Sequence, residues 1–274
     1  MTDLMPTPVV DVDWLAANID RDDVVVFHVI DGGSDAGPRI DGARTFDIDG
    51  DMSDNSGDLA HVMLAYDVFE TKLRELGVND DSLIVAYDTK GIQFAPRAWW
   101  MMRAGGLENV AVLDGGLPAW TAAGHPTTED APTWQPGNVT LDPAPERIIG
   151  KDDVKQALGD DNVRVLDARS TERFEGLGGE KWPVRLGHMS GAKNLPFTEI
   201  LDDGKLLPVA DLQARYNDLI GDAKQTVFTC GSGVTAAIIA LGAAAAGRDN
   251  LAVYDGSWQE WAAADDTEVV TGKA

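Results

Sequence analysis

The chain has 274 residues, of which 44% are hydrophobic, so it can bury the core of one large or two small domains. Its formal net charge of −24 argues against binding to nucleic acids or anionic membranes, because a polyanion would be repelled. A single cysteine excludes an internal disulfide and a thiolate zinc site built by this chain alone. With no visible secretory signal and no apolar run long enough for a membrane span, we expect a cytoplasmic protein.

Short apolar runs alternate with helical patterns in the first half of the chain. Residues 23–31 and 82–88 are typical of buried strands, and residues 67–76 have the apolar spacing of a helix. Residues 110–120 predict a short strand, a glycine turn and a helix start that carries a tryptophan. The following stretch is rich in Pro, Gly, Thr and Asp, so we expect a first domain over residues 8–126 and a surface linker over 127–141.

The second half repeats these elements in the same order. Apolar runs at residues 162–167 and 225–230 match the first two strands, and residues 251–261 match the strand, turn and tryptophan block. Such an ordered set of matches indicates a duplication, with a second domain over residues 142–274. Because strands alternate with helices in both copies, we predict an α/β fold. Each of the two tandem domains is expected to hold a mostly parallel sheet, flanked by helices on both faces.

The only cysteine, Cys230, follows an apolar β-branched run and precedes an apolar helical stretch. A thiol between a strand end and a helix start faces unpaired N–H groups and the positive end of the helix dipole, which favour the nucleophilic thiolate. Gly231 and Gly233 permit a tight loop whose N–H groups form an anion cradle, extending to Val234 and Thr235. This cradle would stabilise a thiolate, and equally a persulfide on the same sulfur.

The chain resembles the two-domain rhodanese-type sulfurtransferases over nearly its full length. Its Cys-Gly-Ser-Gly-Val-Thr loop is similar to that of 3-mercaptopyruvate sulfurtransferases, whereas thiosulfate-type relatives usually carry two basic residues after the cysteine. The duplicated tryptophan block and residues 187–192 also match the family. The resemblance implies tandem rhodanese-like domains, no metal or organic cofactor, and catalysis in the second copy only. In the first copy, Asp88 stands at about the place of Cys230, and a carboxylate cannot accept a sulfane sulfur.

The resemblance also implies two substrate-binding arginines, for which Arg173 and Arg185 are the candidates. Thiosulfate is a dianion that basic loop residues would suit, whereas the loop here is uncharged. A 2-oxo-3-thiol acid is a monoanion whose carboxylate arginine forks outside the loop can hold. We therefore expect 3-mercaptopyruvate as donor, a Cys230 persulfide, release of pyruvate, and a thiol acceptor such as a thioredoxin or small thiol, or cyanide. The alternative for each arginine is a surface ion pair.

A second group of candidates would manage protons. The resemblance suggests that Ser232 acts with an Asp and a His of the first copy, and Asp49 and His61 match that pattern. Histidine is suited to proton transfer near neutral pH. The alternative for His61 is a capping or interface role.

Other functions remain open from the sequence. A thiosulfate:cyanide sulfurtransferase is the first, because both arginines could hold sulfonate oxygens. A cysteine phosphatase or arsenate reductase needs an arginine that closes the loop, and Ala236 stands there. A non-catalytic redox or sulfur-sensing module would also use a lone reactive thiol. The four histidines lack metal-ligand spacing, so we expect no metal site.

Overall fold

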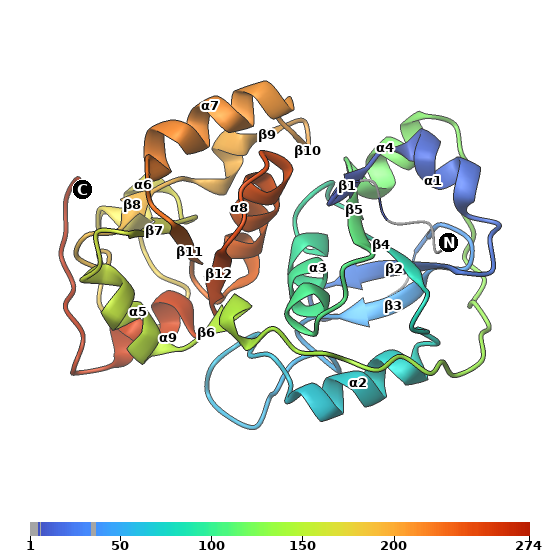
Figure 1. The fold of residues 1–274 in the computed structure, drawn as a ribbon, viewed down its shortest axis with the longest axis horizontal. Helices are drawn as coiled ribbons and strands as arrows, with labels where there is room; N and C mark the ends of the chain where they lie inside the picture. The colour runs from blue at the N-terminus through green and yellow to red at the C-terminus, as the bar shows by residue number, and fades with distance from the viewer. Residues whose placement is uncertain (1–4, 6, 34–36) are drawn as a thin grey trace. The chain divides into compact units, whose positions relative to one another are not determined.

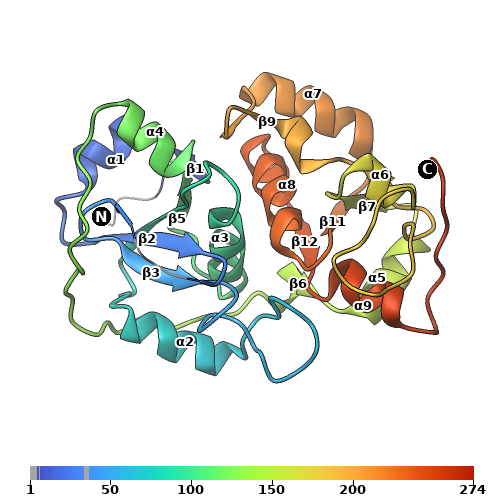
Figure 2. The same cartoon turned by 180° about the vertical axis from the view of Figure 1, so that it is seen from behind.

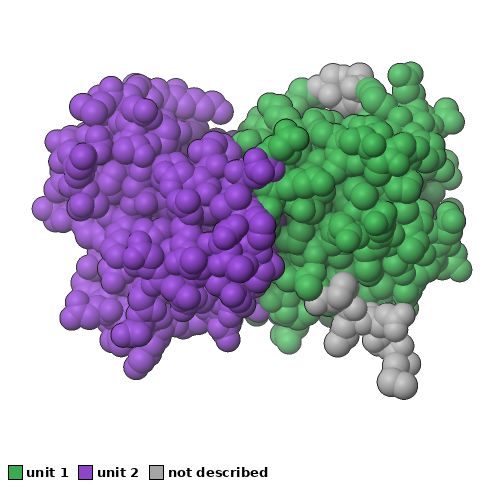
Figure 3. All heavy atoms as spheres, turned by 90° about the horizontal axis from the view of Figure 1, so that it is seen from above, with its two compact units in different colours: residues 1–54, 63–144, 203–206 green, residues 55–62, 145–202, 207–274 purple. Residues whose placement is uncertain are grey.

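The computed structural model describes residues 5, 7–33 and 37–274. The chain divides into two compact units, coloured in Figure 3. Unit 1 comprises residues 1–54, 63–144 and 203–206, and unit 2 comprises residues 55–62, 145–202 and 207–274. None of the helices in the described residues is long and apolar enough to cross a membrane.

Unit 1 contains a five-stranded sheet, parallel throughout, in the order β1-β5-β4-β2-β3 (Figure 1). Its strands are β1 Val9–Val10, β2 Val24–Ile30, β3 Arg44–Asp47, β4 Leu83–Tyr87 and β5 Val110–Leu113. Its helices are α1 Val12–Asn18, α2 Tyr66–Glu75, α3 Ala95–Ala104 and α4 Gly116–Ala122. The central strand β4 is buried along its whole length, as expected for a parallel sheet covered on both faces.

Unit 2 repeats this arrangement with the order β6-β12-β11-β7-β8, again parallel throughout. Its strands are β6 Ile148–Ile149, β7 Val163–Asp167, β8 Lys193–Asn194, β11 Gln225–Thr229 and β12 Leu251–Tyr254. Its α-helices are α5 Lys151–Leu158, α6 Thr171–Phe174, α7 Val209–Ile220, α8 Val234–Ala245 and α9 Ser257–Ala263. The 3₁₀ helices η1 Pro145–Arg147 and η2 Phe197–Ile200, with the short strands β9 Leu201–Asp202 and β10 Lys205–Leu206, lie outside the two large sheets.

Helices cover both faces of each sheet. In unit 2, α5 and α9 pack on one face around Val165, Val227 and Trp258, while α7 and α8 pack together on the opposite face (Figures 1 and 2). In unit 1, α1 and α4 cover the face that contains Val26 and Val85, against which Leu15 of α1 and Trp120 of α4 pack. The prediction of tandem α/β domains with mostly parallel, doubly covered sheets is confirmed. Edge strands of two residues carry too little pattern to be found in the sequence.

A single domain boundary would assign the first half of the chain to one unit and the second half to the other. Two short segments do not follow this division. Residues 55–62, from the first half, are part of unit 2, and residues 203–206, from the second half, are part of unit 1. In unit 1, the N–H of Leu206 donates to the Asp114 carboxylate at 3.0 Å. A contiguous boundary drawn from composition cannot show such an exchange, because the partners are distant in sequence.

The stretch predicted as a linker is fixed along α2 of unit 1. Trp134 Nε1 donates to the Glu75 carbonyl at 2.8 Å, and Val139, which is fully buried, donates its N–H to the Val78 carbonyl at 3.1 Å. The segment therefore contributes to the packing of unit 1 although its composition is that of an exposed connection. The domain boundaries derived from the sequence stay a prediction.

Candidate active site

Cys230 lies directly after β11, the central strand of the unit 2 sheet, and four residues before the start of α8. In an open parallel sheet, this carboxyl edge is where ligands bind. Gly233, the N-cap of α8, has φ +81°, a conformation that favours glycine and lets the chain turn sharply into the helix. The thiol thus lies between a strand end and a helix N-terminus, as the sequence predicts.

The loop that follows Cys230 is supported by α9. The Cys230 N–H donates to Ser257 Oγ at 3.3 Å, and the N–H groups of Trp258 and Gln259 donate to the carbonyls of Cys230 and Gly231, each at 3.0 Å. Ser257 is fully buried and has φ +49°, a strained conformation for a residue with a side chain. The α9 start therefore determines the geometry of the loop.

The N–H groups of the loop itself are available for the cradle expected from the sequence. Within the described part of the chain, no protein acceptor takes a hydrogen bond from the N–H of Gly231, Ser232 or Gly233. Buried N–H groups require acceptors, so these three can donate hydrogen bonds to an anion that forms beside them. This arrangement can hold a thiolate, a persulfide or the anionic part of a substrate.

Two side chains of unit 2 lie against the residue after the cysteine. A Cβ placed on Gly231 would be 3.2 Å from Arg173 Nη2 and 3.2 Å from Trp182 Cζ3. Cys230 itself is only 2% exposed. Arg173 and Trp182 are both partly exposed, so the side chains beside the loop are accessible to a donor from solution.

Arg173 is one member of a network of alternating charges. Its guanidinium contacts Glu180, whose other carboxylate oxygen accepts from Arg169 at 2.8 Å, and Arg169 pairs in turn with Asp167 at 2.7 Å. Burial alone would lower the pKa of Arg169, but the carboxylates of Asp167 and Glu180 raise it above its usual value. The Arg169 guanidinium also lies 4.2 Å from the centre of the Trp258 ring. The network orients Arg173 next to the cradle.

His61 and Ser232 form a side-chain pair within unit 2. The His61 Nδ1 lies 2.9 Å from Ser232 Oγ, and both residues are buried. His61 has φ +61°, so its backbone is strained, as is frequent at functional sites. Two of the three residues expected to transfer protons are therefore in hydrogen-bonding contact. One of them, Ser232, lies two residues after Cys230 in the sequence.

Gln259 fixes the segment that carries His61. Its side-chain amide donates to the Asp58 carbonyl at 2.8 Å and accepts from the Ala60 N–H at 3.1 Å. Since the backbone of the same residue binds Gly231, Gln259 links the cysteine loop with the histidine segment. These contacts all lie within unit 2.

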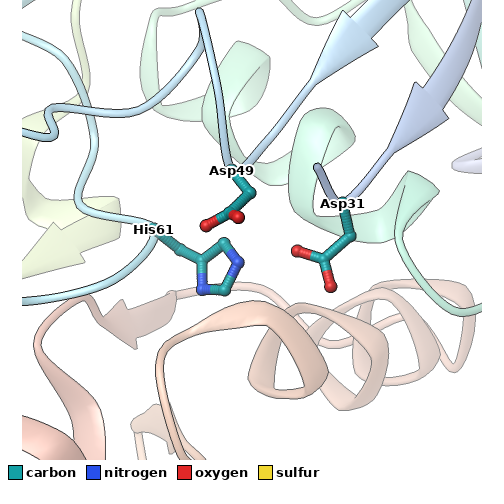
Figure 4. Close-up of side chains that lie close together, drawn as sticks. All are labelled: Asp31, Asp49 and His61. Atoms are coloured by element: carbon teal, nitrogen blue, oxygen red, sulfur yellow. The ribbon is translucent and has the colours of Figure 1, made fainter. Parts of the chain in front are cut away.

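Asp49, the third proton-handling candidate, belongs to unit 1. It follows β3, and Asp31 follows β2. A carboxylate oxygen of Asp49 and a carboxylate oxygen of Asp31 lie within 4.8 Å of each other (Figure 4). Both carboxylates thus stand at the carboxyl edge of the unit 1 sheet. The participation of Asp49 in a relay with Ser232 stays a prediction.

Arg185 is engaged at the end of α9. Its guanidinium donates to the carbonyls of Ala262 at 2.9 Å, Thr267 at 3.0 Å and Trp261 at 3.2 Å, and also contacts Ala264. A cation on the last carbonyls of a helix is favoured by the helix dipole. These contacts argue for a structural role, and substrate binding by Arg185 stays a prediction.

The sequence did not single out Ser257, Gln259, Glu180 or Trp182. The first two lie in the duplicated tryptophan block, whose sequence indicates a repeat and contains no sign of a contact with the loop. Glu180 and Trp182 lie in residues 177–184, between the two candidate arginines.

Comparison with known proteins agrees with the repeated fold. The profile of the rhodanese-like domain matches residues 11–123 and again 150–264, so the chain belongs to the rhodanese-like family and carries two of its domains. It is 34% identical to the 3-mercaptopyruvate sulfurtransferase of Escherichia coli K12, over 94% of this chain and 95% of that protein. A chicken thiosulfate sulfurtransferase is also 34% identical, over 81% of this chain and 78% of its own.

Solved structures show the same similarity. The crystal structure of an Escherichia coli protein described among the 3-mercaptopyruvate sulfotransferases has a TM-score of 0.81 at 33% identity, and covers 92% of this chain and 99% of its own. The chain is thus a sulfurtransferase of the 3-mercaptopyruvate and thiosulfate sulfurtransferase family. This class uses a small sulfur donor and a thiol or cyanide acceptor.

Proposed function

We propose that the protein transfers a sulfane sulfur from 3-mercaptopyruvate, through a persulfide on Cys230, to a thiol or cyanide. The observation that carries the proposal is the placement of the single cysteine in a cradle of N–H groups, two residues from a Ser232–His61 pair. The uncharged loop favours a monoanionic donor, and the guanidinium of the adjacent Arg173 can bind the carboxylate of that donor.

In the first step, the Cys230 thiolate attacks the sulfur atom of the bound donor. A sulfur–sulfur bond forms while the carbon–sulfur bond breaks, and its electron pair remains on carbon as the enolate of pyruvate. The N–H groups of Gly231, Ser232 and Gly233 stabilise the negative charge that moves through the site. Protonation of the enolate carbon then releases pyruvate.

The Ser232–His61 pair supplies a route for that proton. With 2.9 Å between Ser232 Oγ and His61 Nδ1, the hydroxyl can pass a proton on and recover it from the imidazole. Positioned acid–base groups of this kind contribute about 10²–10⁴ in rate. Asp49 is kept as the proposed third member.

In the second step, an acceptor thiolate attacks the outer sulfur of the persulfide. The acceptor leaves as a persulfide and the Cys230 thiolate is regenerated, so atoms and electrons balance over the cycle. Cyanide in the same step gives thiocyanate. We propose a thioredoxin or a small thiol as the acceptor class.

Mass spectrometry after exposure to 3-mercaptopyruvate tests the proposal. The wild-type protein should gain one sulfur atom per chain, removable by thiol, and should release one pyruvate in the same turnover. Cys230→Ser should do neither, whereas Ser190→Ala, at a serine outside the loop, should leave both intact. Pyruvate release by Cys230→Ser would overturn the assignment.

Thiosulfate is the second candidate donor, because a relative named for it has the same 34% identity as one named for 3-mercaptopyruvate, although over 81% instead of 94% of this chain. Comparing kcat/KM for the two donors with one acceptor separates them. A higher value for thiosulfate would replace the donor in the proposal and leave the Cys230 persulfide in place.

We propose that unit 1 has no catalytic role of its own. Asp88 directly follows β4, the central strand of the unit 1 sheet, where unit 2 has Cys230. Its carboxylate accepts from the N–H groups of Lys90, Gln93, Phe94 and Ala95, at 2.7–3.0 Å. The cradle of unit 1 thus contains a carboxylate of the chain itself.

A further inference from the structure

The charges next to the cysteine loop cancel one another. Two guanidinium groups, Arg169 and Arg173, share a network with two carboxylates, Asp167 and Glu180. Three of these side chains are at most 1% exposed, and Arg173 alone, at 31%, reaches solvent. The cation that stands beside the loop is therefore compensated by a buried anion in direct contact with it.

Glu180 is the residue that makes this compensation. One of its carboxylate oxygens contacts Arg173, while the other accepts from Arg169 at 2.8 Å. Arg169 already has Asp167 as a partner, which accepts from it through both carboxylate oxygens. Removing the charge of Glu180 would thus leave one net positive charge at Arg173, within contact distance of Gly231.

We propose that Glu180 is a specificity-determining residue, which selects a singly charged donor over a doubly charged one by neutralising Arg173. The inference rests on the proposed function and identifies the feature that sets its donor preference. Discrimination arises from charge balance, in addition to the absence of basic residues in the loop.

The physical reason is that the interaction of a donor with a nearby net charge scales with the charge of the donor. A dianion such as thiosulfate gains about twice as much as a monoanion from each uncompensated positive charge at the same distance. Conversely, compensation removes more binding energy from the dianion. The effect is strong here because Glu180 is buried, where screening by salt is weak.

Lys181 offers a second charge close to the same place. This exposed residue has its Nζ 5.4 Å from the centre of the Trp182 ring, and Trp182 lies against Gly231. Its removal should act in the direction opposite to that of Glu180, although more weakly because of solvent screening. Lys181 has no part in the buried network, so its substitution is not expected to impair folding.

The test compares kcat/KM for thiosulfate with kcat/KM for 3-mercaptopyruvate in three variants at low ionic strength. Glu180→Gln keeps the size of the side chain and should raise the thiosulfate-to-mercaptopyruvate ratio about tenfold. Lys181→Gln should lower it about twofold. Asp161→Asn makes the same charge change as Glu180→Gln at the amino end of β7, the opposite edge of the sheet, and should leave the ratio unchanged.

An unchanged or lower ratio in folded Glu180→Gln would overturn the proposal, and so would an equal rise in Asp161→Asn. If Glu180→Gln does not fold, because Arg169 loses a partner, Lys181→Gln decides: a lower ratio supports charge-based selection and an unchanged ratio refutes it. A protein that forms no persulfide from 3-mercaptopyruvate would instead refute the proposed function. The two failures are therefore distinguishable.

Discussion

Asp88 follows β4 in the same way that Cys230 follows β11. Each residue lies at the carboxyl end of the central strand of its sheet, and each is followed by a loop and a helix, α3 or α8. In unit 1, four N–H groups converge on the Asp88 carboxylate. The same position at the end of the central strand thus holds a fixed carboxylate in unit 1 and a thiol in unit 2.

Asp88→Ala should destabilise unit 1 and leave the chemistry of unit 2 unchanged. The substitution leaves four N–H donors without their acceptor, two of them next to the buried start of α3, at a cost of about 3 kcal/mol or more. Denaturant unfolding followed by fluorescence measures the loss. The exposed Asp81→Ala, just before β4, is the control and should change the midpoint little. Equal midpoints for Asp88→Ala and wild type would contradict the cradle in unit 1.

His61→Ala and Ser232→Ala should each lower kcat for pyruvate release by about 10²-fold, because each removes one end of the proposed proton route. Residues that act as a unit give non-additive losses, so the double variant should be no slower than the slower single variant. Single-turnover pyruvate release measures this. Multiplicative losses in the double variant would show that the two side chains act separately. A pH–rate profile of His61→Ala identical to that of wild type would remove His61 from the chemistry.

Gln259→Leu should lower kcat with little change in KM for the donor. The variant removes both hydrogen bonds to the backbone of Asp58 and Ala60, which position His61, but leaves Arg173 in place. Gln213→Leu is a matched control, since its amide donates to the Ala246 carbonyl away from the loop. An increase in KM alone, or an equal loss in both variants, would contradict a positioning role. Combining Gln259→Leu with His61→Ala should cause no further loss.

Asp266 should make stability depend on pH in the acid range. Hydrogen bonds from Lys155 and Lys151 lower the pKa of this carboxyl from 3.8 to about 2, so the native state favours its ionised form. The ionised Asp266 carboxylate therefore makes its full contribution to folding stability above pH 3.8, and this contribution is lost as the pH falls toward 2. Asp266→Asn should lower the thermal midpoint at pH 7 by at most about 3 °C, since the pairs are exposed.

Thermal unfolding of Asp266→Asn and wild type between pH 7 and pH 3 checks this dependence. The two midpoints should converge as the pH falls. Asp265→Asn, at the exposed neighbouring position, is the control, because it removes a carboxylate and leaves the contacts of Asp266 with Lys151 and Lys155 in place. A gap between Asp266→Asn and wild type that widens on acidification would have the wrong sign.

The sequence predicted the fold class well because the long strands carry the signal. Strand β2 and strand β4 are apolar runs rich in β-branched residues, and α7 has a regular apolar face, so their type could be read locally. Strands β1 and β6 have two residues each and form only because a neighbouring strand is already in place. Such edges depend on tertiary contacts, which no local pattern contains.

The candidate site was predictable where one motif contains the chemistry. Cys230, Gly231 and Ser232 are adjacent in sequence, so their juxtaposition needed no fold. Glu180 and Gln259 act through partners that the chain approaches only after folding, for instance the carbonyl of Asp58, about two hundred residues from Gln259. Glutamate and glutamine are common on protein surfaces. Nothing in the local sequence distinguishes a side chain that binds a distant segment from one that is solvated.

The exchange of residues 55–62 and 203–206 between the units has a consequence for biosynthesis and for evolution. His61 leaves the ribosome long before Ser232 and Gln259 are made, so that stretch has to wait without its partners until those residues have been synthesised. A gene split at the composition boundary would separate the histidine from the nucleophile it accompanies. Since each half of the chain contributes a segment to the compact unit formed mostly by the other half, a single cut at that boundary would divide both units.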